Sequence, residues 1–149
     1  MQNIDEKRPT MNYLDRDTYG MYKPAESKGP GPELMGADTL NGNDVVNRKD
    51  ESLGDIKEFM LDMQSGRVSY AVLSFGGFLG VGTKLFAVPW EALTLDTANK
   101  RFVLDVEKNA LENAPGFDQD QWPNMADPVW SEGIHAYYHT TPYKGNLSV

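Results

Sequence analysis

The most restrictive feature of this sequence is a run of short, strand-like segments between residues 43 and 106, with no helical pattern between them. The segments are NDVVN, SLGDIKEFMLD, VSYAVLSF, KLFAVP, ALTLD and RFVLDV. Five or six short strands within about 65 residues, each followed by a turn, are typical of a small antiparallel β-barrel or sandwich. Closure into a barrel removes exposed strand edges, so the sequence predicts an all-β barrel of about six short strands.

Local patterns refine two of these segments and two of the turns between them. SLGDIKEFMLD departs once from strict alternation of apolar and polar residues, which predicts a β-bulge or a twist. Gly66 lies in the turn at residues 64–67, where a positive φ angle is expected, and Asn99 and Lys100 form another turn. VSYAVLSF carries apolar residues at alternate and intervening positions, so it is expected to be buried on much of both faces.

The pattern becomes helical after the last strand. EKNALENA has apolar residues at helical spacing and ends at Pro115, which predicts a short helix. DPVWSEGIHAYYH begins with Asp127 as a candidate N-cap and Pro128 at the first helical position. One or two C-terminal helices are therefore expected to pack on the barrel. The second helix would present an apolar stripe made of Val129, Trp130, Ile134, Tyr137 and Tyr138.

The sequence divides into four segments. Residues 1–36 are rich in Pro and Gly and show no strand or helix period, which predicts a flexible N-terminal tail. The barrel is expected at 37–106, the helical segment at 107–141, and a frayed end at 142–149. The tail contains Tyr13, Tyr19, Met21 and Tyr22, which leave open the alternative that it docks on the barrel.

Composition excludes several classes of partner. The 149 residues are 40% hydrophobic, which suffices for one modest domain with a core. A net charge of -8 disfavours binding to nucleic acid or to an anionic membrane, because such binding depends on Lys and Arg. No segment reaches the ~18 apolar residues of a membrane span, and Cys is absent, so we expect a cytoplasmic protein without disulfides or thiolate sites.

The glycine-rich segment SFGGFLGVGTKLFAVPW raises the possibility of a phosphate-binding loop. Gly77 and Gly82 have the required separation, but Thr83 precedes Lys84 and a strand follows instead of a helix. The segment therefore predicts a connection between two strands, with no bound nucleotide cofactor. It carries three large apolar side chains that either fold over the barrel or form a surface for a partner. These are Phe78, Leu79 and Val81.

Three stretches, LGDIKEFMLDMQSGRVSYAV, SFGGFLGVGTKLFAVPWEAL and RFVLDVEKNALENAPGF, closely resemble the PRC-barrel family over about residues 38–117. The extension DQDQWPNMADPVW is similar to the C-terminal segment of stand-alone bacterial members. Relatives carry this barrel in the H subunit of the photosynthetic reaction centre and in a ribosome-maturation factor. In both it is a non-catalytic platform for protein contacts. The resemblance thus implies a PRC-type barrel that assembles through its surfaces.

The expected function is a non-enzymatic protein-interaction module that pairs with itself as a homodimer or joins a larger complex. Phe78, Leu79 and Val81 are the candidate interface residues, together with Trp90, which follows Pro89 at a strand end. Trp90 has a second interpretation, because its apolar neighbours are also typical of packing at the barrel rim.

Candidate catalytic and metal-binding residues are few. His135 and His139 have the i, i+4 spacing that places two imidazoles on one helix face, so they form a weak candidate metal site. Asp118 and Asp120 resemble the start of a calcium loop, but Trp122 occupies the third ligand position. No nucleophile motif is present, which indicates that the chain is not an enzyme. The alternative function is a small-molecule or metal-responsive protein that uses the acidic surface or the two histidines.

Overall fold

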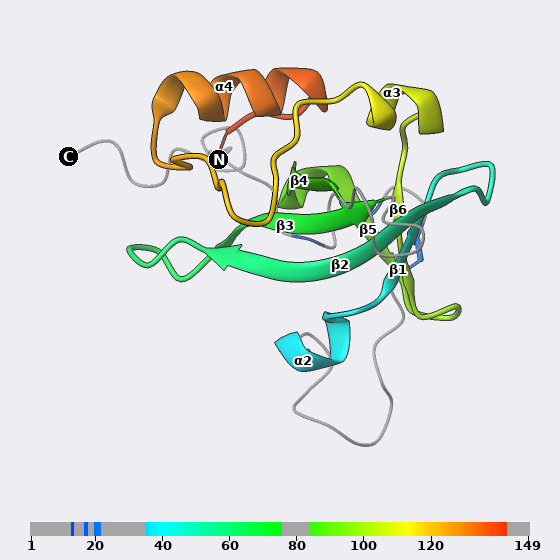
Figure 1. Ribbon diagram of the computed structural model, residues 1–149. Helices are drawn as coiled ribbons and strands as arrows, with labels where there is room; N and C mark the ends of the chain where they lie inside the picture. The colour runs from blue at the N-terminus through cyan, green and yellow to red at the C-terminus, as the bar shows by residue number, and fades with distance from the viewer. Residues whose placement is uncertain (1–12, 14–16, 18–19, 22–34, 76–83, 143–149) are drawn as a thin grey trace, which may run out of the picture.

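The computed structural model describes residues 13, 17, 20, 21, 35–75 and 84–142. Strands dominate, and three short α-helices and one 3-10 turn accompany them (Figure 1). In the described part of the chain, no helix is long and apolar enough to cross a membrane. The elements are α2 (Ala37–Leu40), β1 (Asp44–Val46), β2 (Ser52–Leu61), β3 (Val68–Phe75), β4 (Lys84–Pro89), η3 (Trp90–Ala92), β5 (Leu93–Asp96), β6 (Arg101–Leu104), α3 (Lys108–Glu112) and α4 (Pro128–Tyr137).

The six strands form one curled sheet in the order β4-β3-β2-β1-β6-β5. The predicted barrel-type, strand-dominated fold is thereby confirmed, with two differences. First, β1 pairs with β6 in parallel, with Val45 opposite Phe102, whereas the other neighbours are antiparallel. A parallel pair needs a long connection between its strands, and strands β2 to β5 supply it. Second, β4 and β5 lie at opposite edges of the sheet, so the described strands leave it open.

The local turn and bulge predictions are confirmed. Strand β2 has irregular register against both β1 and β3, as its interrupted alternation indicated. Gly66 has a φ of 79° and Lys100 a φ of 56°, so both turns use left-handed backbone. Asp96 stabilises the second turn by accepting hydrogen bonds from the backbone and side-chain nitrogens of Asn99.

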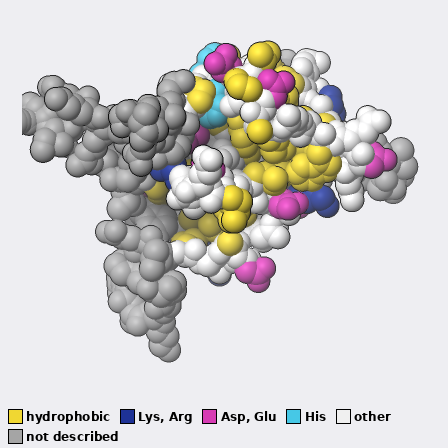
Figure 2. Space-filling model, turned by 90° about the vertical axis from the view of Figure 1, so that its left-hand side faces the viewer, with side chains coloured by type: hydrophobic (Ala, Val, Ile, Leu, Met, Phe, Trp, Pro, Cys, Tyr) yellow, Lys and Arg dark blue, Asp and Glu magenta, His cyan; other side chains and the backbone are white. Residues whose placement is uncertain are grey.

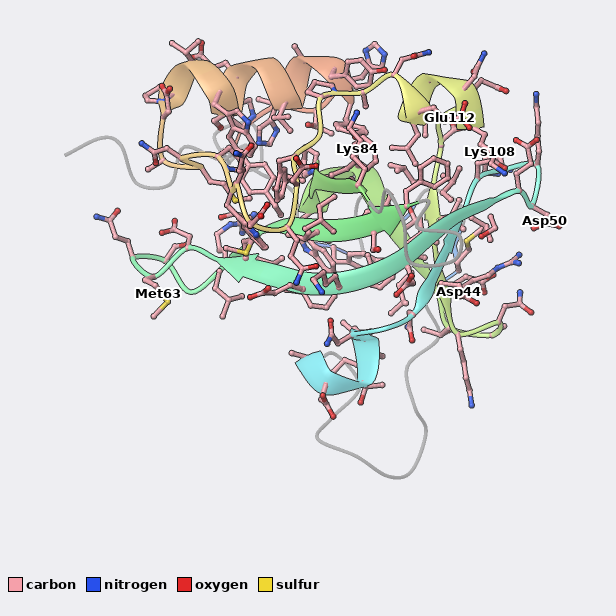
Figure 3. The ribbon with its side chains drawn as sticks, viewed as in Figure 1. Asp44, Asp50, Met63, Lys84, Lys108 and Glu112 are labelled. Atoms are coloured by element: carbon pink, nitrogen blue, oxygen red, sulfur yellow. The ribbon has the colours of Figure 1, made fainter. Side chains whose placement is uncertain are left out.

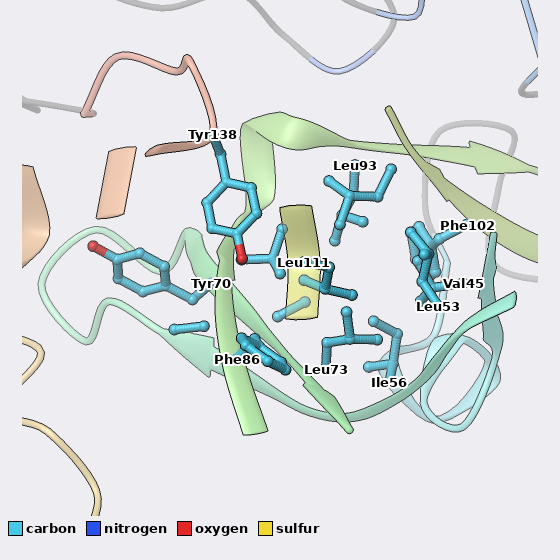
Figure 4. Close-up of a cluster of buried hydrophobic side chains, with 14 of the residues drawn as sticks. Val45, Leu53, Ile56, Tyr70, Leu73, Phe86, Leu93, Phe102, Leu111 and Tyr138 are labelled. Atoms are coloured by element: carbon cyan, nitrogen blue, oxygen red, sulfur yellow. The ribbon is translucent and has the colours of Figure 1, made fainter. Parts of the chain in front are cut away.

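One face of the sheet is covered by α3 and α4 (Figure 1). Asp127 caps α4 by accepting a hydrogen bond from the Val129 amide at 3.0 Å, and Pro128 begins the helix, as predicted. Ile134 and Tyr138 of this segment are buried in the core. That core combines residues from the strands and from both helices (Figure 4). Its largest fully buried side chains include Phe86, Phe102, Leu53, Ile56, Leu73, Leu85, Leu93, Leu104 and Leu111.

Both edges of the sheet are covered in part by other segments. At β4, Phe117 exchanges two backbone hydrogen bonds with Leu85, of 2.8 and 2.9 Å. At β5, the Tyr13 hydroxyl accepts from the Leu95 amide, and the Met21 carbonyl accepts from Thr97. Tyr13 and Met21 of the predicted flexible tail therefore contact the sheet, in line with the docked alternative. Tyr19 and Tyr22 lie outside the described residues, and the four segment boundaries remain predictions.

Gly54 allows a close approach between β2 and β3. It lies in β2 with a φ of 120°, and a Cβ atom built there would be 2.0 Å from the Ser74 carbonyl oxygen. We predict that Gly54→Ala destabilises the fold by about 2 to 4 kcal/mol, because a side chain adds both backbone strain and a clash. Gly66→Ala is the matched control, since its φ is also positive but its Cβ would meet no atom within 4 Å. Urea unfolding should show a loss of only about 1 kcal/mol for the control, and equal losses would contradict the clash.

Tyr138 carries a buried hydroxyl with no hydrogen-bond partner among the described residues. Figure 4 shows this hydroxyl pointing into the apolar cluster, and burial raises the pKa of Tyr138 above its ordinary value. We predict that Tyr138→Phe leaves the unfolding free energy unchanged or raises it by up to about 1 kcal/mol, because no bond is lost.

Tyr137→Phe provides the matched comparison. The Tyr137 hydroxyl donates to the Ala110 carbonyl oxygen at 2.5 Å. Its removal should cost about 1 kcal/mol in the same denaturation experiment. A loss at Tyr138 as large as that at Tyr137 would show that the Tyr138 hydroxyl does have a partner.

Candidate functional site

A pocket of about 140 Å³ lies between the β2–β3 turn, the start of β3, η3 and α4. Polar and charged side chains form most of its wall, unlike the apolar core beside it. Its lining residues are Asp62, Arg67, Val68, Ser69, Tyr70, Glu91, Met125, Ser131, His135 and Pro142.

Tyr70 connects the pocket to the helix above it. Its hydroxyl lies 2.9 Å from the Ser131 hydroxyl, which belongs to α4. Its ring packs against Trp130 and His135, with centroid distances of 5.3 and 5.7 Å. Burial raises the pKa of the Tyr70 phenol, although the hydrogen bond with Ser131 opposes this. Tyr70 is therefore a neutral, fixed hydroxyl in the pocket wall.

Charged residues also line the pocket. Arg67 follows the β2–β3 turn, and its guanidinium lies 3.7 Å from the Glu91 carboxylate of η3. Asp62 begins the turn and accepts from the Gln64 amide and the Ser65 hydroxyl, both at 3.0 Å. These bonds lower the pKa of Asp62, so it remains a carboxylate. The pocket thus offers two carboxylates, one guanidinium and neutral donors, a set suited to a small polar group.

His135 and His139 do not share a helix face. His135 lies in α4, is only 5% exposed, and places Nδ1 2.8 Å from the Thr140 hydroxyl. Helix α4 ends at Tyr137, and His139 follows it with a φ of 61° and an exposed side chain. The i, i+4 helical geometry behind the candidate metal pair is absent. Within the described ranges, no group of three His, Cys, Asp or Glu side chains could hold a metal ion.

The Thr140 hydroxyl also lies 3.4 Å from the His135 carbonyl oxygen and can donate to it. Its oxygen is then an acceptor for an Nδ1–H group of His135. This arrangement leaves Nε2 of a neutral imidazole as an acceptor in a residue that lines the pocket. The histidine therefore has a structural role at the end of α4, and it forms part of the pocket wall.

Large apolar side chains are exposed at the same end of the molecule. Met63 is 87% exposed at the β2–β3 turn, and Leu61 beside it is 55% exposed. Val129, in the first turn of α4, is 77% exposed. The β2–β3 turn and the start of α4 lie on the left of Figure 1, and Figure 3 shows Met63 projecting from the turn. We call Leu61, Met63 and Val129 the apolar end face. Figure 2 views this end and shows hydrophobic side chains gathered in its middle, with acidic ones around them.

The interface residues predicted from sequence are only partly described. Phe78, Leu79 and Val81 lie outside the described residues. Trp90 is half-buried, and its ring contacts Tyr13, Phe59 and Phe102 at centroid distances of 6.0 to 6.1 Å. This placement agrees with packing at the barrel rim.

Asp118 and Asp120 are exposed in the loop before α4, where Trp122 packs on Phe117 at 5.0 Å. The Trp122 indole nitrogen donates to the Gln119 carbonyl oxygen at 2.7 Å. The loop is therefore pinned by aromatic contacts. The pocket itself was not predicted, because Arg67, Tyr70, Glu91 and Ser131 come from separate segments with no spacing motif.

The buried histidine predicts a pH dependence of stability. Burial lowers the pKa of His135 below its ordinary value of 6.5. The unfolded chain then binds a proton more readily than the folded one. The stability that comes from keeping His135 neutral is complete above about pH 6.5. This part of the unfolding free energy is lost as the pH falls through the lowered pKa of His135 in the folded state. The melting temperature should fall between pH 7.5 and 5.5, and His135→Gln should reduce this fall.

His139→Gln is the control for this measurement. His139 is exposed, so its replacement should leave the fall in melting temperature unchanged. If both variants behaved like the parent chain, burial of His135 would not be the cause.

The comparison with family models agrees with the fold. The family model of the PRC-barrel domain matches residues 32–111. No curated protein matches the chain. Among solved structures, the chain is similar to one from Pseudomonas aeruginosa described as the 16S ribosomal RNA processing protein RimM, with 17% identity and a TM-score of 0.36. That match covers 54% of this chain and 49% of the other, so this chain spans about half the length of that structure.

The family match begins before α2 and ends at Leu111, one residue before the end of α3, and it includes all six strands of the curled sheet. It covers more than half of the sequence. On this basis the chain belongs to the PRC-barrel domain family.

Proposed function

We propose that this protein is a non-enzymatic assembly module that associates with a second copy of itself through exposed apolar side chains. The observation that carries the proposal is the apolar end face, where Leu61, Met63 and Val129 are all more than half exposed. Single exposed apolar residues are common on protein surfaces, but several at one end are typical of interaction sites. Met63 adds a flexible side chain that adapts to different partner surfaces.

The position of the end face favours contact with another protein. It consists of a turn and the first turn of a helix, which project from the sheet and can reach a partner without distorting the core (Figure 1). The net charge of -8 opposes association of two copies. At physiological ionic strength this repulsion is screened beyond about 8 Å, so a local apolar contact is the stronger effect. Pairing of identical surfaces about a two-fold axis is the commonest arrangement for soluble chains.

The segment containing Phe78, Leu79 and Val81 is a second proposed surface, and it rests on the sequence alone. It connects Phe75 at the end of β3 to Lys84 at the start of β4. Leu61 of the apolar end face pairs with Val68 at the other end of β3. The two surfaces can therefore be tested independently by substitution. Trp90 follows Pro89, which pairs with Tyr70 at the other end of β4, so it is not part of this second surface.

The mass of the parent chain in solution tests self-association, and two double variants locate it. We predict that the parent is a dimer at tens of micromolar by light scattering. Leu61→Ser with Met63→Ser should lower the mass toward that of the monomer, because the substitutions remove exposed apolar area at the end face. The matched double variant, Phe78→Ser with Leu79→Ser, tests the sequence-based surface in the same way. A monomeric parent would contradict the proposal, and a dimer unaffected by either variant would exclude both surfaces.

A second candidate function is binding of a small polar ligand in the pocket. It is favoured by the pocket itself, whose wall combines Tyr70, Ser131 and His135 with the charged pair of Arg67 and Glu91. A thermal-shift panel of small polar metabolites and divalent cations separates the two functions. A compound that raises the melting temperature by several degrees at a low molar excess over the protein would favour ligand binding, provided that Ser131→Val abolishes the shift.

A further inference from the structure

The N-terminal residues that contact β5 form a turn with hydrogen bonds of its own. We call Tyr13, Asp17, Gly20 and Met21 the N-terminal strap. The Asp17 carbonyl accepts from the Gly20 amide, and the Asp17 carboxylate accepts from the Met21 amide, both at 3.1 Å. Gly20 completes this turn with a φ of 62°. The turn thus holds the Met21 carbonyl in place by bonds internal to the strap.

The strap uses its two ends to cover the edge of β5. At one end, the Met21 carbonyl accepts from the amide and hydroxyl of Thr97, at 3.4 and 3.1 Å. At the other, the Tyr13 hydroxyl accepts from the Leu95 amide, and its ring lies 6.1 Å from that of Trp90. The amides of Leu95 and Thr97 are two residues apart and so face the same edge. An uncovered edge of this kind is a site for pairing with another chain.

The length of the connection permits the strap to reach a different copy. Residues 22–36 separate Met21 from α2, and they include Pro24, Pro30 and Pro32. Fifteen residues can extend to about 50 Å. A domain of this size is roughly 40 Å across. The same contacts can therefore form within one chain or between two neighbouring chains.

We propose that two associated copies exchange their N-terminal straps, so that Tyr13 and Met21 of each copy dock on the β5 edge of the other. Separate chains at micromolar concentration favour the internal contact, because a short linker holds the strap at an effective concentration in the millimolar range. Association through another surface raises the local concentration of the second β5 edge to a similar level. Exchange then forms the same hydrogen bonds and adds a second connection between the copies. This inference rests on the self-association proposed above and names a contact within it.

Cysteine cross-linking tests the exchange, because the chain contains no cysteine of its own. Met21→Cys and Thr97→Cys are introduced into separate full-length chains, one of them isotopically labelled, and the two are mixed under mild oxidation. The expected product is a covalent dimer of one labelled and one unlabelled chain, joined between positions 21 and 97. The control mixture combines Met21→Cys with Lys108→Cys, an exposed position in α3 (Figure 3), and should give far less product.

A single chain that carries both Met21→Cys and Thr97→Cys shows, at high dilution, whether the two positions can be joined. If oxidation does not close this internal link, a short bis-maleimide replaces it in every sample. A dimeric parent whose mixed variants do not cross-link, although the double variant closes internally, would overturn the exchange and leave self-association intact. A monomeric parent without cross-linking would contradict both. Equal yield with the Lys108→Cys control would also overturn the exchange.

Discussion

The open sheet is the constraint on which the rest of this structure depends. Six short strands curl without pairing β4 to β5 in the described part of the chain, so two edges and an apolar face need covering. Unpaired backbone groups at a strand edge readily pair with other chains, and an uncovered apolar face is unstable in water. Different segments of the chain cover the two edges and the apolar face. Phe117 pairs with β4, the strap around Tyr13 and Met21 covers β5, and α3 and α4 cover the face.

Helix α4 also forms one wall of the pocket, because its interface with the sheet contains both apolar and polar contacts. Trp130 and Ile134 supply apolar area, while Ser131 and His135 place polar groups against Tyr70 of β3. Buried polar groups at such an interface are usually hydrogen-bonded, as the Tyr70 hydroxyl is with Ser131 and His135 is with Thr140. The pocket lies between α4 and the turn that joins β2 to β3. The exposed side chains of the apolar end face lie on the same turn and at the start of α4. The structure therefore combines a polar recess and an apolar end face in one region.

Much of the fold could be predicted from local patterns. Each strand, the irregularity in β2, the turn at Gly66 and the cap at Asp127 follow from residues adjacent in the sequence. Pairing across long distances could not be predicted in the same way. The parallel contact between Val45 and Phe102 depends on how the whole sheet curls, and alternation within a strand does not specify its neighbour.

In the candidate site, too, local features could be predicted from the sequence and long-range contacts could not. The sequence by itself determined that a strand-dominated domain would form, because periodicity and turn residues are local properties of the chain. Its PRC type followed from the resemblance of three stretches to that family, and the family match confirms it. The sequence also singled out Trp90 and His135, but it left Trp90 between an interface and the barrel rim and placed His135 on one helix face with His139. Tertiary structure alone decided that Trp90 packs at the rim and that His135 and His139 separate, since the end of α4 depends on its packing. The pocket was likewise decided in three dimensions, because its charged pair and its hydroxyls come from segments that only folding brings together.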